Sequence, residues 1–219
     1  MADVDSRSGS RYAGPEVLEW TAGVHAPHDD ALERAYRAPE REGLPAIQIG
    51  PSEGRALELL LRLAGARRVV EIGTLAGYSA LWMARAVGPE GRVWTIEADP
   101  KTAAVARGNL AASPTGDRVT LVEGTALEVL STLEPEGPFD AVFVDADKRN
   151  YPHYGAWAAA NLRAGALLLG DNAYLFGRLL AEEDDAVAMR RFHEESAGAF
   201  DSVCLPTPDG MLVGIRRPS

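Results

Sequence analysis

The stretch Phe139-Asp-Ala-Val-Phe-Val-Asp145-Ala-Asp147-Lys148 decides the fold class of this 219-residue chain. It joins an apolar run to an acidic cluster, and the pattern recurs at Ala166-Leu-Leu-Leu-Gly170-Asp171-Asn172. Continuous apolar runs of this length are typical of strands that are buried on both faces of a parallel sheet. Ligands of such sheets bind beyond the carboxyl ends of the strands, so we expect Asp145, Asp171 and Asn172 to meet at one point.

The acidic clusters indicate a metal site with a lysine beside it. Carboxylate and amide oxygens suit Mg²⁺ or Ca²⁺ better than Zn²⁺. Of the 22 basic residues, only Lys101 and Lys148 are lysines. A lysine can lose its proton near neutral pH in a suitable place, whereas an arginine stays charged. We therefore interpret Lys148 as a group that exchanges a proton with a molecule held at the metal, with simple pairing to a neighbouring acid as the alternative.

Strands and helices alternate on both sides of this stretch. The pattern predicts strands at 68–72, 92–96, 118–122, 139–144 and up to 170, and helices at 78–87, 100–111, 126–133, 151–162 and 181–196. Residues 202–205 and 211–215 flank Pro206-Thr-Pro-Asp-Gly210 and predict an antiparallel hairpin. Five strand–helix units and a hairpin predict an α/β fold with a Rossmann-like, doubly wound, seven-stranded sheet. It is mostly parallel, with one antiparallel strand contributed by the C-terminal hairpin.

The first part of the chain predicts a helical addition to this sheet. Residues 15–41 indicate one or two short helices, and a clearer helix opens at Pro51 and ends near Gly65. Residues 1–14 are rich in Ser, Gly and Arg, so we expect a flexible N-terminus followed by a single domain over 15–219. His25 and His28 lie close to two aspartates, and we interpret both as part of a solvated face.

Composition excludes several classes of function. A net charge of −10 and a pI near 4.9 argue against a nucleic-acid partner, which usually needs a basic surface. No apolar run approaches the 18 or more residues that span a membrane. Cys204 is the lone cysteine and predicts a small buried side chain in a reducing compartment. Without the features of a signal peptide at the start, we expect the cytoplasm.

A glycine turn follows the first predicted strand, at Glu71-Ile-Gly-Thr-Leu-Ala-Gly-Tyr-Ser79. Glycine lets the backbone approach a ligand closely, and Glu97 at the end of the next strand could accept hydrogen bonds from ribose hydroxyls. The turn lacks the second glycine that a pyrophosphate requires in dinucleotide sites. An acidic Glu71 would also repel phosphate and favour a cation. S-adenosylmethionine (SAM), which has a ribose, an ammonium and a sulfonium, fits better than a nicotinamide dinucleotide.

These motifs, in this order, resemble the cation-dependent O-methyltransferases of the caffeoyl-coenzyme A and catechol group. The resemblance spans about residues 48–216 and includes Ser52-Glu-Gly54, Glu97-Ala-Asp-Pro100, Glu123-Gly-Thr-Ala126 and Leu205-Pro-Thr-Pro-Asp-Gly210. It implies a divalent cation, Mg²⁺ first and Ca²⁺ or Mn²⁺ as alternatives, on Asp145, Asp171 and Asn172. It implies that Lys148 is catalytic and that the protein is a homodimer. The SAM pocket that it implies is lined by Glu71, Gly73, Thr74, Ser79, Glu97, Ala126, Asp145 and Asp147.

The departures from the family pattern concern the methyl acceptor. Leu175-Phe176 stands where a tryptophan is common, and Arg190-Arg-Phe-His193 replaces Arg-x-Phe-Asn. Tyr151 and Tyr154 are interpreted as packing residues. The expected acceptor is a catechol-like small molecule. The alternatives are a hydroxylated tRNA base and a non-catalytic binding protein with this fold, and a nicotinamide-linked oxidoreductase comes last.

Overall fold

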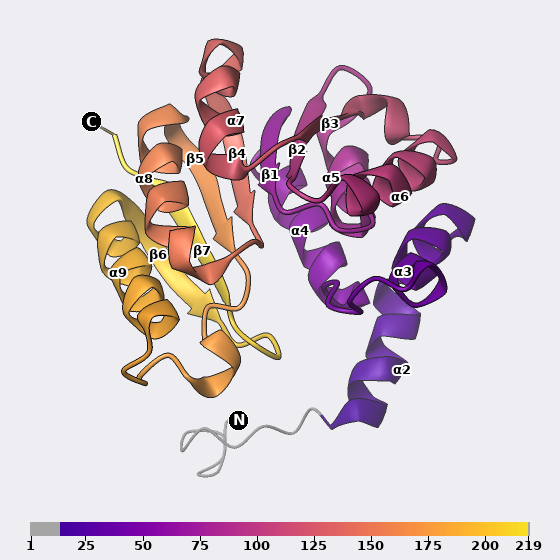
Figure 1. The fold of residues 1–219 in the computed structure, drawn as a ribbon, viewed down its shortest axis with the longest axis horizontal. Helices are drawn as coiled ribbons and strands as arrows, with labels where there is room; N and C mark the ends of the chain where they lie inside the picture. The colour runs from indigo at the N-terminus through magenta and orange to yellow at the C-terminus, as the bar shows by residue number, and fades with distance from the viewer. Residues whose placement is uncertain (1–13, 219) are drawn as a thin grey trace.

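The computed structural model describes residues 14–218, in which one seven-stranded sheet has the order β3-β2-β1-β4-β5-β7-β6 (Figure 1). The strands are β1 (Arg68–Ile72), β2 (Arg92–Glu97), β3 (Val119–Glu123), β4 (Phe139–Val144), β5 (Leu162–Gly170), β6 (Phe200–Leu205) and β7 (Met211–Arg216). The pairs among β1 to β5 are parallel, and β7 runs antiparallel to both β5 and β6. The prediction of a doubly wound sheet with one antiparallel strand from the hairpin is confirmed.

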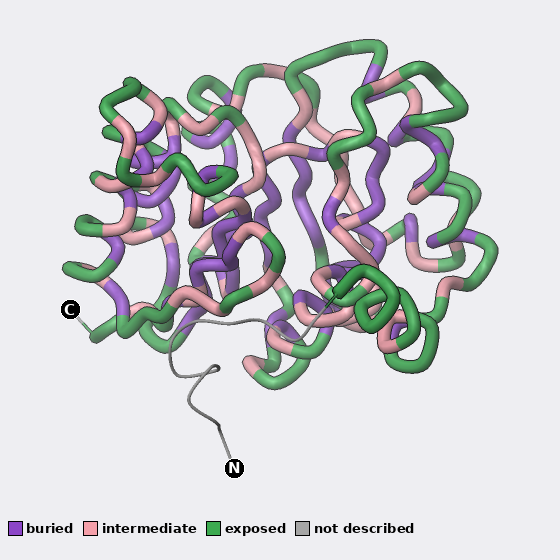
Figure 2. Tube along the Cα trace, turned by 90° about the horizontal axis from the view of Figure 1, so that it is seen from below, coloured by how far each residue is buried: buried purple, intermediate pink, exposed green. Residues whose placement is uncertain are grey.

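Helices cover both faces of the sheet. They are α2 (Pro15–His25), α3 (Asp30–Glu42), α4 (Pro51–Leu63), α5 (Tyr78–Val87), α6 (Pro100–Ala111), α7 (Ala126–Leu133), α8 (Tyr151–Asn161) and α9 (Asp184–Ala199). Figure 1 shows α7, α8 and α9 on one side and α4, α5 and α6 on the other. The buried backbone gathers in the central strands between these layers (Figure 2). Short 3₁₀ turns at 116–118, 134–136, 148–150 and 175–177 complete the element order.

The two faces of the sheet have separate cores because side chains alternate along a strand. Val70 and Ile72 of β1 pack with α7, α8 and α9, whereas Val69 packs with α4 and α5. All three are fully buried. This alternation also places Glu71 on the α5 side of the sheet, in line with Val69.

The predicted N-terminal helices are present as α2 and α3. Asp29 caps α3 by accepting a hydrogen bond from the N–H of Leu32 at 3.0 Å, and Gly43 ends the helix in a left-handed conformation. The expected flexible segment at residues 1–14 lies outside the described residues, apart from Gly14 at the start of α2. Within the described part of the chain, no helix is both long and apolar enough to cross a membrane.

The last helix starts three residues later than the sequence predicted, at Asp184. The guanidinium of Arg190 explains the difference, because it donates hydrogen bonds to the carbonyl oxygens of Leu179 and Ala181, both at 2.7 Å. These bonds hold the preceding segment in a loop over the side of α9. The same helix ends three residues later than predicted, at Ala199, and the other predicted limits agree to within two residues.

Candidate active site

A cavity of about 1010 Å³ lies along the carboxyl edge of the sheet. Backbone hydrogen bonds continue the sheet just past the strand ends: Gly124 N to Glu97 O, Gly73 N to Ile96 O, Asp145 N to Ile72 O and Asp171 N to Val144 O, all at 2.9–3.1 Å. Because the strand order is β3-β2-β1-β4-β5, these bonds set the predicted site residues in one row. The β1–β3 half of the cavity is lined by Gly73, Thr74, Ser79, Glu97 and Ala126. The β4–β5 half is lined by Asp145, Asp147, Lys148, Asn172 and Phe176.

The β1–β3 half depends on a backbone that only glycine allows. Gly73 has a φ of 99°, and a Cβ atom there would lie 2.0 Å from the carbonyl oxygen of Asp145. The carboxylate of Glu97 is held by two backbone N–H groups, those of Leu75 at 2.9 Å and Asp99 at 3.0 Å. A carboxylate has about four acceptor positions, so Glu97 retains capacity for two hydroxyl donors.

Glu71 lies beneath the glycine turn and is fully buried, and it does not line the cavity. Its carboxylate accepts hydrogen bonds from the hydroxyls of Ser79 and Thr95. Burial raises the pKa of Glu71 to about 8, against the lowering effect of these two bonds. The predicted contact between Glu71 and a cationic ligand stays a prediction, and the geometry routes its influence through Ser79, which does line the cavity.

In the β4–β5 half, Lys148 stands beside the acidic cluster as predicted. Its Nζ lies 3.3 Å from Oδ1 of Asp145 and 2.9 Å from the hydroxyl of Tyr151, and the lysine side chain is 14% exposed. The alternative reading, that Lys148 pairs with a neighbouring acid, is therefore also present in the geometry. Asp147 is oriented by hydrogen bonds from Tyr154 and Asn150, both at 2.6 Å.

Asp171 supplies the test of whether this half suits a metal. Its Oδ1 is buried and has no hydrogen-bond partner among the described residues. Burial, followed by the charges of Asp145 and Glu53, raises the pKa of Asp171 to about 7. Burial also raises the pKa of Asp145, whereas the positive charge of Lys148 and its hydrogen bond to Asp145 act to lower that pKa.

A partly buried carboxylate, a buried carboxylate and the amide of Asn172 therefore follow two adjacent strands with the ammonium of Lys148 nearby, a set of oxygen donors that fits a hard divalent cation. The set includes only two acidic side chains. In agreement, no group of three or more His, Cys, Asp or Glu residues among 14–218 is arranged to hold a metal.

Two tyrosines have roles that the sequence did not indicate. Tyr151 packs edge-on against Phe192, as a packing residue should, but its hydroxyl also contacts Lys148 and the carbonyl oxygen of Asp171 at 3.1 Å. Burial raises the pKa of Tyr151 well above its usual value, so its hydroxyl stays neutral. Tyr154 lines the cavity and donates to Asp147. The only signal was the spacing of three residues from Lys148 to Tyr151, one turn of a helix.

The turn that follows Asp171 has an unusual backbone. Asn172, Leu175 and Phe176 have φ values of 52°, 50° and 54°, in the left-handed region that disfavours residues other than glycine. Each such residue costs about 1–3 kcal/mol, which the surroundings must offset. The N–H of Phe176 donates to Oδ1 of Asp209 at 2.7 Å, and the backbone carbonyl of Asp209 accepts a second bond from the same turn at 2.9 Å. The β6–β7 connection thus holds the turn in place.

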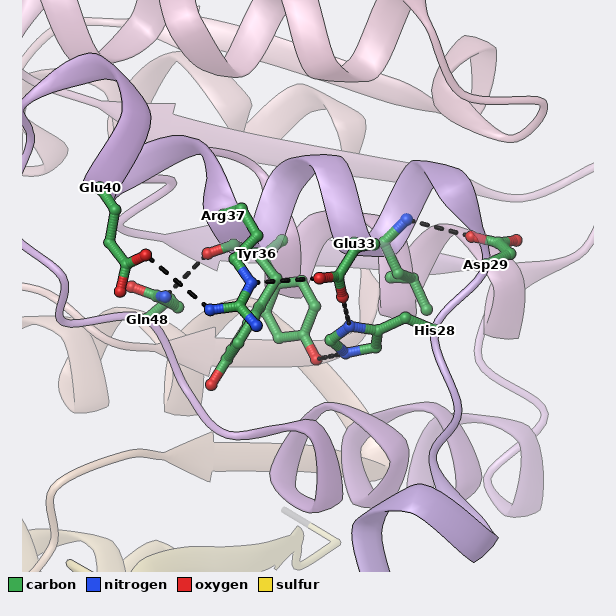
Figure 3. Close-up of polar contacts among 9 residues, drawn as sticks. His28, Asp29, Glu33, Tyr36, Arg37, Glu40 and Gln48 are labelled. Atoms are coloured by element: carbon green, nitrogen blue, oxygen red, sulfur yellow. Dashed lines mark hydrogen bonds and ion pairs between the residues drawn. The ribbon is translucent and has the colours of Figure 1, made fainter. Parts of the chain in front are cut away.

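His28 is not on a solvated face, so that expectation is wrong, whereas His25 is exposed as predicted. The imidazole of His28 is 11% exposed and bridges Glu33 and the hydroxyl of Tyr78, both at 2.7 Å (Figure 3). Both nitrogens find partners because α3 begins just after this residue and turns the ring toward α5. His28 lines a second cavity of about 680 Å³, and Tyr78 lines the first, so this hydrogen bond links the linings of the two cavities.

The fold and the cavity define a protein of the methyltransferase class, with a Rossmann-like sheet and a site along its carboxyl edge. A family model described as O-methyltransferase matches residues 24–216, and the chain belongs to this family.

Known relatives agree with this assignment. The chain is 49% identical over 179 residues to a catechol O-methyltransferase of Mycobacterium tuberculosis, covering 81% of each protein. It is 42% identical over 191 residues to a catechol O-methyltransferase of Niastella koreensis, covering 86% of each. The crystal structure of an O-methyltransferase from Bacillus cereus in complex with SAH superposes with a TM-score of 0.88 at 36% identity, covering 92% of this chain and 97% of that one.

Proposed function

We propose that this protein transfers the methyl group of SAM to a hydroxyl of a catechol-like small molecule, with the help of a divalent cation, Mg²⁺ first and Ca²⁺ or Mn²⁺ as alternatives. The family and the names of the two curated relatives support the reaction. The SAH in the Bacillus cereus structure supports the methyl donor, because SAH is what SAM becomes when it loses the methyl group.

One observation carries the proposal: Lys148 and Asp145 line the β4–β5 half of the cavity, and the buried, unpartnered Oδ1 of Asp171 belongs to a carboxyl group close enough to feel the charge of Asp145. A non-catalytic binding protein would gain nothing from a buried carboxylate oxygen without a partner, since such a group costs stability. A cation site beside a lysine would explain why the carboxyl groups of Asp145 and Asp171 follow two adjacent strands, β4 and β5.

The β1–β3 half suits the nucleoside of the donor. Glu97 would accept hydrogen bonds from the ribose hydroxyls. Ala126 follows β3, the next strand along the edge, at the start of α7, and would contact the base. The backbone at Gly73 and Thr74 would pass beneath the methionine part of the donor. Asp147, just past the end of β4, would also line the donor site.

The β4–β5 half suits the acceptor. Asp145, Asp171 and Asn172 would hold the divalent cation, which supplies a Lewis acid that lowers the pKa of a phenol and fixes its direction. Lys148 would accept the hydroxyl proton at its Nζ, directly or through one water. The deprotonated oxygen would then form a bond to the methyl carbon while the carbon–sulfur bond of SAM breaks. The electron pair of the broken carbon–sulfur bond stays on sulfur, which gives SAH. Alignment of two substrates in one cavity can contribute about 7–11 kcal/mol.

The test is methyl transfer from labelled SAM to a panel of catechols, with Mg²⁺ and again with excess EDTA. We expect labelled product only with the metal. A protein that binds SAM but labels no catechol would contradict the proposal, and transfer to tRNA would then be the next assay. Labelled product in the presence of excess EDTA would contradict the proposed metal dependence but would still support the methyltransferase activity.

We also infer a homodimer that works in the reducing cytosol. Val17, Trp20 and Val24 of α2 are 50%, 69% and 52% exposed, and such apolar positions support contact with a second chain. Cys204 is unpaired, which supports a reducing compartment. Light scattering during gel filtration should give twice the chain mass of 23.4 kDa, and a single-chain mass would contradict the dimer.

A further inference from the structure

The side chain of Lys148 is held by two hydrogen bonds at its tip. It is 14% exposed, and its Nζ lies 3.3 Å from Oδ1 of Asp145 and 2.9 Å from the hydroxyl of Tyr151. Holding a long side chain in one place costs conformational entropy, which these contacts must offset. Asp145 is also a proposed metal ligand. Tyr151 is therefore the partner of Lys148 that lies outside the proposed set of metal ligands.

The hydroxyl of Tyr151 is arranged to accept a hydrogen bond from Lys148. It has a single proton to donate, and the carbonyl oxygens of Val144 and Asp171 lie 3.2 and 3.1 Å from it. Carbonyl oxygens only accept, so the hydroxyl donates its proton to them and keeps its lone pairs for Nζ. Val144 ends β4 and Asp171 follows β5, so Tyr151 connects the lysine to the ends of both strands.

The ring of Tyr151 is fixed by packing. Tyr151 is fully buried at the first position of α8, and its ring meets that of Phe192 on α9 edge-on, with centroids 5.2 Å apart. Nζ of Lys148 lies 4.8 Å from the centroid of the tyrosine ring. The contact of α8 with α9 therefore holds the hydroxyl, and the hydroxyl holds Nζ.

The two hydrogen bonds leave one position on Nζ without a partner among them. An amine nitrogen has four positions: one joins the side chain, and two carry the N–H groups that Asp145 and Tyr151 accept. The fourth is where a lone pair can take up a proton. Lys148 lines the cavity, so fixing the other positions directs the fourth toward the acceptor. Without the hydroxyl of Tyr151, rotation about the last bond of the side chain would spread the lone pair over several directions.

We propose that Tyr151 is a positioning residue that directs Nζ of Lys148 toward the hydroxyl group of the acceptor. Tyr151 is buried and does not line the cavity, so it acts through Lys148 and not by touching either substrate. This inference rests on the proposed methyl transfer, in which Lys148 accepts the proton. The competing interpretation is that Tyr151 only packs α8 against α9.

The first experiment observes the lysine without any reaction. Because the chain has two lysines, protein labelled with ¹³C at lysine Cε gives NMR signals from two sites, and Lys148→Met identifies those of Lys148. In the wild type we expect separate shifts for the two hydrogens on Cε of Lys148, since a fixed side chain holds them in different surroundings. Those of Lys101, which is exposed, should coincide. Tyr151→Phe should bring the Lys148 pair together. A coincident pair in the wild type, or an unchanged separation in Tyr151→Phe, would overturn the inference.

The second experiment measures kcat with a catechol that the wild type methylates. Tyr151→Phe keeps the packed ring and removes only the hydroxyl, and it should lower kcat about 10- to 100-fold, the size expected when a reacting group is misaligned. The Kd of SAM, measured by calorimetry, should change much less than kcat. Tyr36→Phe, which removes a hydroxyl on α3, is the matched control and should keep the wild-type kcat. A wild-type kcat in Tyr151→Phe would contradict the positioning role.

The third experiment separates positioning from a general loss of structure. If Tyr151 acts only through Lys148, then Tyr151→Phe should lower kcat by less than about twofold in a protein that already carries Lys148→Met, because the effects of residues in contact are not additive. A loss as large as that in the single variant would mean that the hydroxyl supports the whole site, which would overturn the inference. A wild type that methylates no catechol would contradict the proposed function instead. The NMR result does not depend on activity, so the two failures are distinguishable.

Discussion

The two halves of the cavity are built by different means. In the β1–β3 half the left-handed backbone positions are mostly glycines, Gly73, Gly77 and Gly124, and local hydrogen bonds shape the turns. In the β4–β5 half three of the left-handed positions are not glycines, Asn172, Leu175 and Phe176, beside Gly177, and contacts with a hairpin far along the chain support the turn.

The difference shows which part of the site needs support from distant contacts to keep its shape. Glycine turns need no outside support, because glycine adopts these conformations without strain. The turn after β5 costs free energy that the β6–β7 connection offsets, so its shape depends on tertiary contacts. We conclude that the shape of the β1–β3 half is set mainly by local turns, whereas the shape of the β4–β5 half depends on contacts with a distant hairpin.

The largest expected effect tests the β4–β5 half alone. Lys148→Met removes the proposed base and should lower kcat by about 10²–10⁴-fold, the usual contribution of general-base catalysis. The Kd of SAM should change much less than kcat, because Lys148 is not one of the residues proposed to line the donor site. Lys101→Met is the matched control, since Lys101 is the only other lysine and is exposed on α6. Wild-type turnover in Lys148→Met would refute the role of base.

The next effect separates the metal from the donor. Asp171→Asn removes the charge of a buried carboxylate with an unpartnered oxygen and should weaken Mg²⁺ binding, measured by calorimetry, by more than about tenfold. Loss of an outer-shell partner of a metal costs about 10–100-fold, so the loss of a direct ligand should exceed that range's lower end. Asp184→Asn, on an exposed helix start, should bind Mg²⁺ as the wild type does. Equal affinity in the two variants would remove Asp171 from the metal site.

The smallest expected effect on binding concerns the β1–β3 half. Glu71→Gln should change the Kd of SAM by less than about tenfold, or 1.4 kcal/mol, because Glu71 acts through Ser79 and does not line the cavity. A larger loss would mean that Glu71 meets the donor directly, as the sequence predicted.

The same variant has a clear pH signature. The pKa of Glu71 is about 8 in the folded protein against 4.5 as a model value, so the folded state holds a proton that the unfolded state has lost between these pH values. The free energy of unfolding therefore falls as pH rises from about 5 to 8. Glu71→Gln lacks this contribution, and chemical denaturation at pH 5 and pH 8 should show a smaller fall in the variant.

Much of the fold could be predicted because its signals are local. The apolar runs that end at Val144 and Gly170 became adjacent parallel strands, and the acids that follow them lie side by side. The alternation of side chains in β1 could also have placed Glu71 on the buried α5 side. The motif at Glu71 suggested a ligand contact instead, and the sequence offered no measure of burial.

The remainder of the site depends on contacts between distant segments. Asp209 supports Phe176 across 33 positions of sequence, and His28 meets Tyr78 across 50. No periodic pattern marks such pairs. The left-handed backbone of Leu175 and Phe176 gave no signal either, because turn propensities favour glycine and asparagine at such positions.

The place of β7 in the sheet has a consequence for how the protein is made. β7 is translated after the six other strands, yet it lies between β5 and β6. Since chains emerge from the ribosome N-terminal end first, every residue of the proposed donor site leaves the ribosome before Asp209 and β7 do. A nascent chain can therefore present every residue of the proposed donor site while Asp209 and β7, which complete the β4–β5 side, are still to be synthesised.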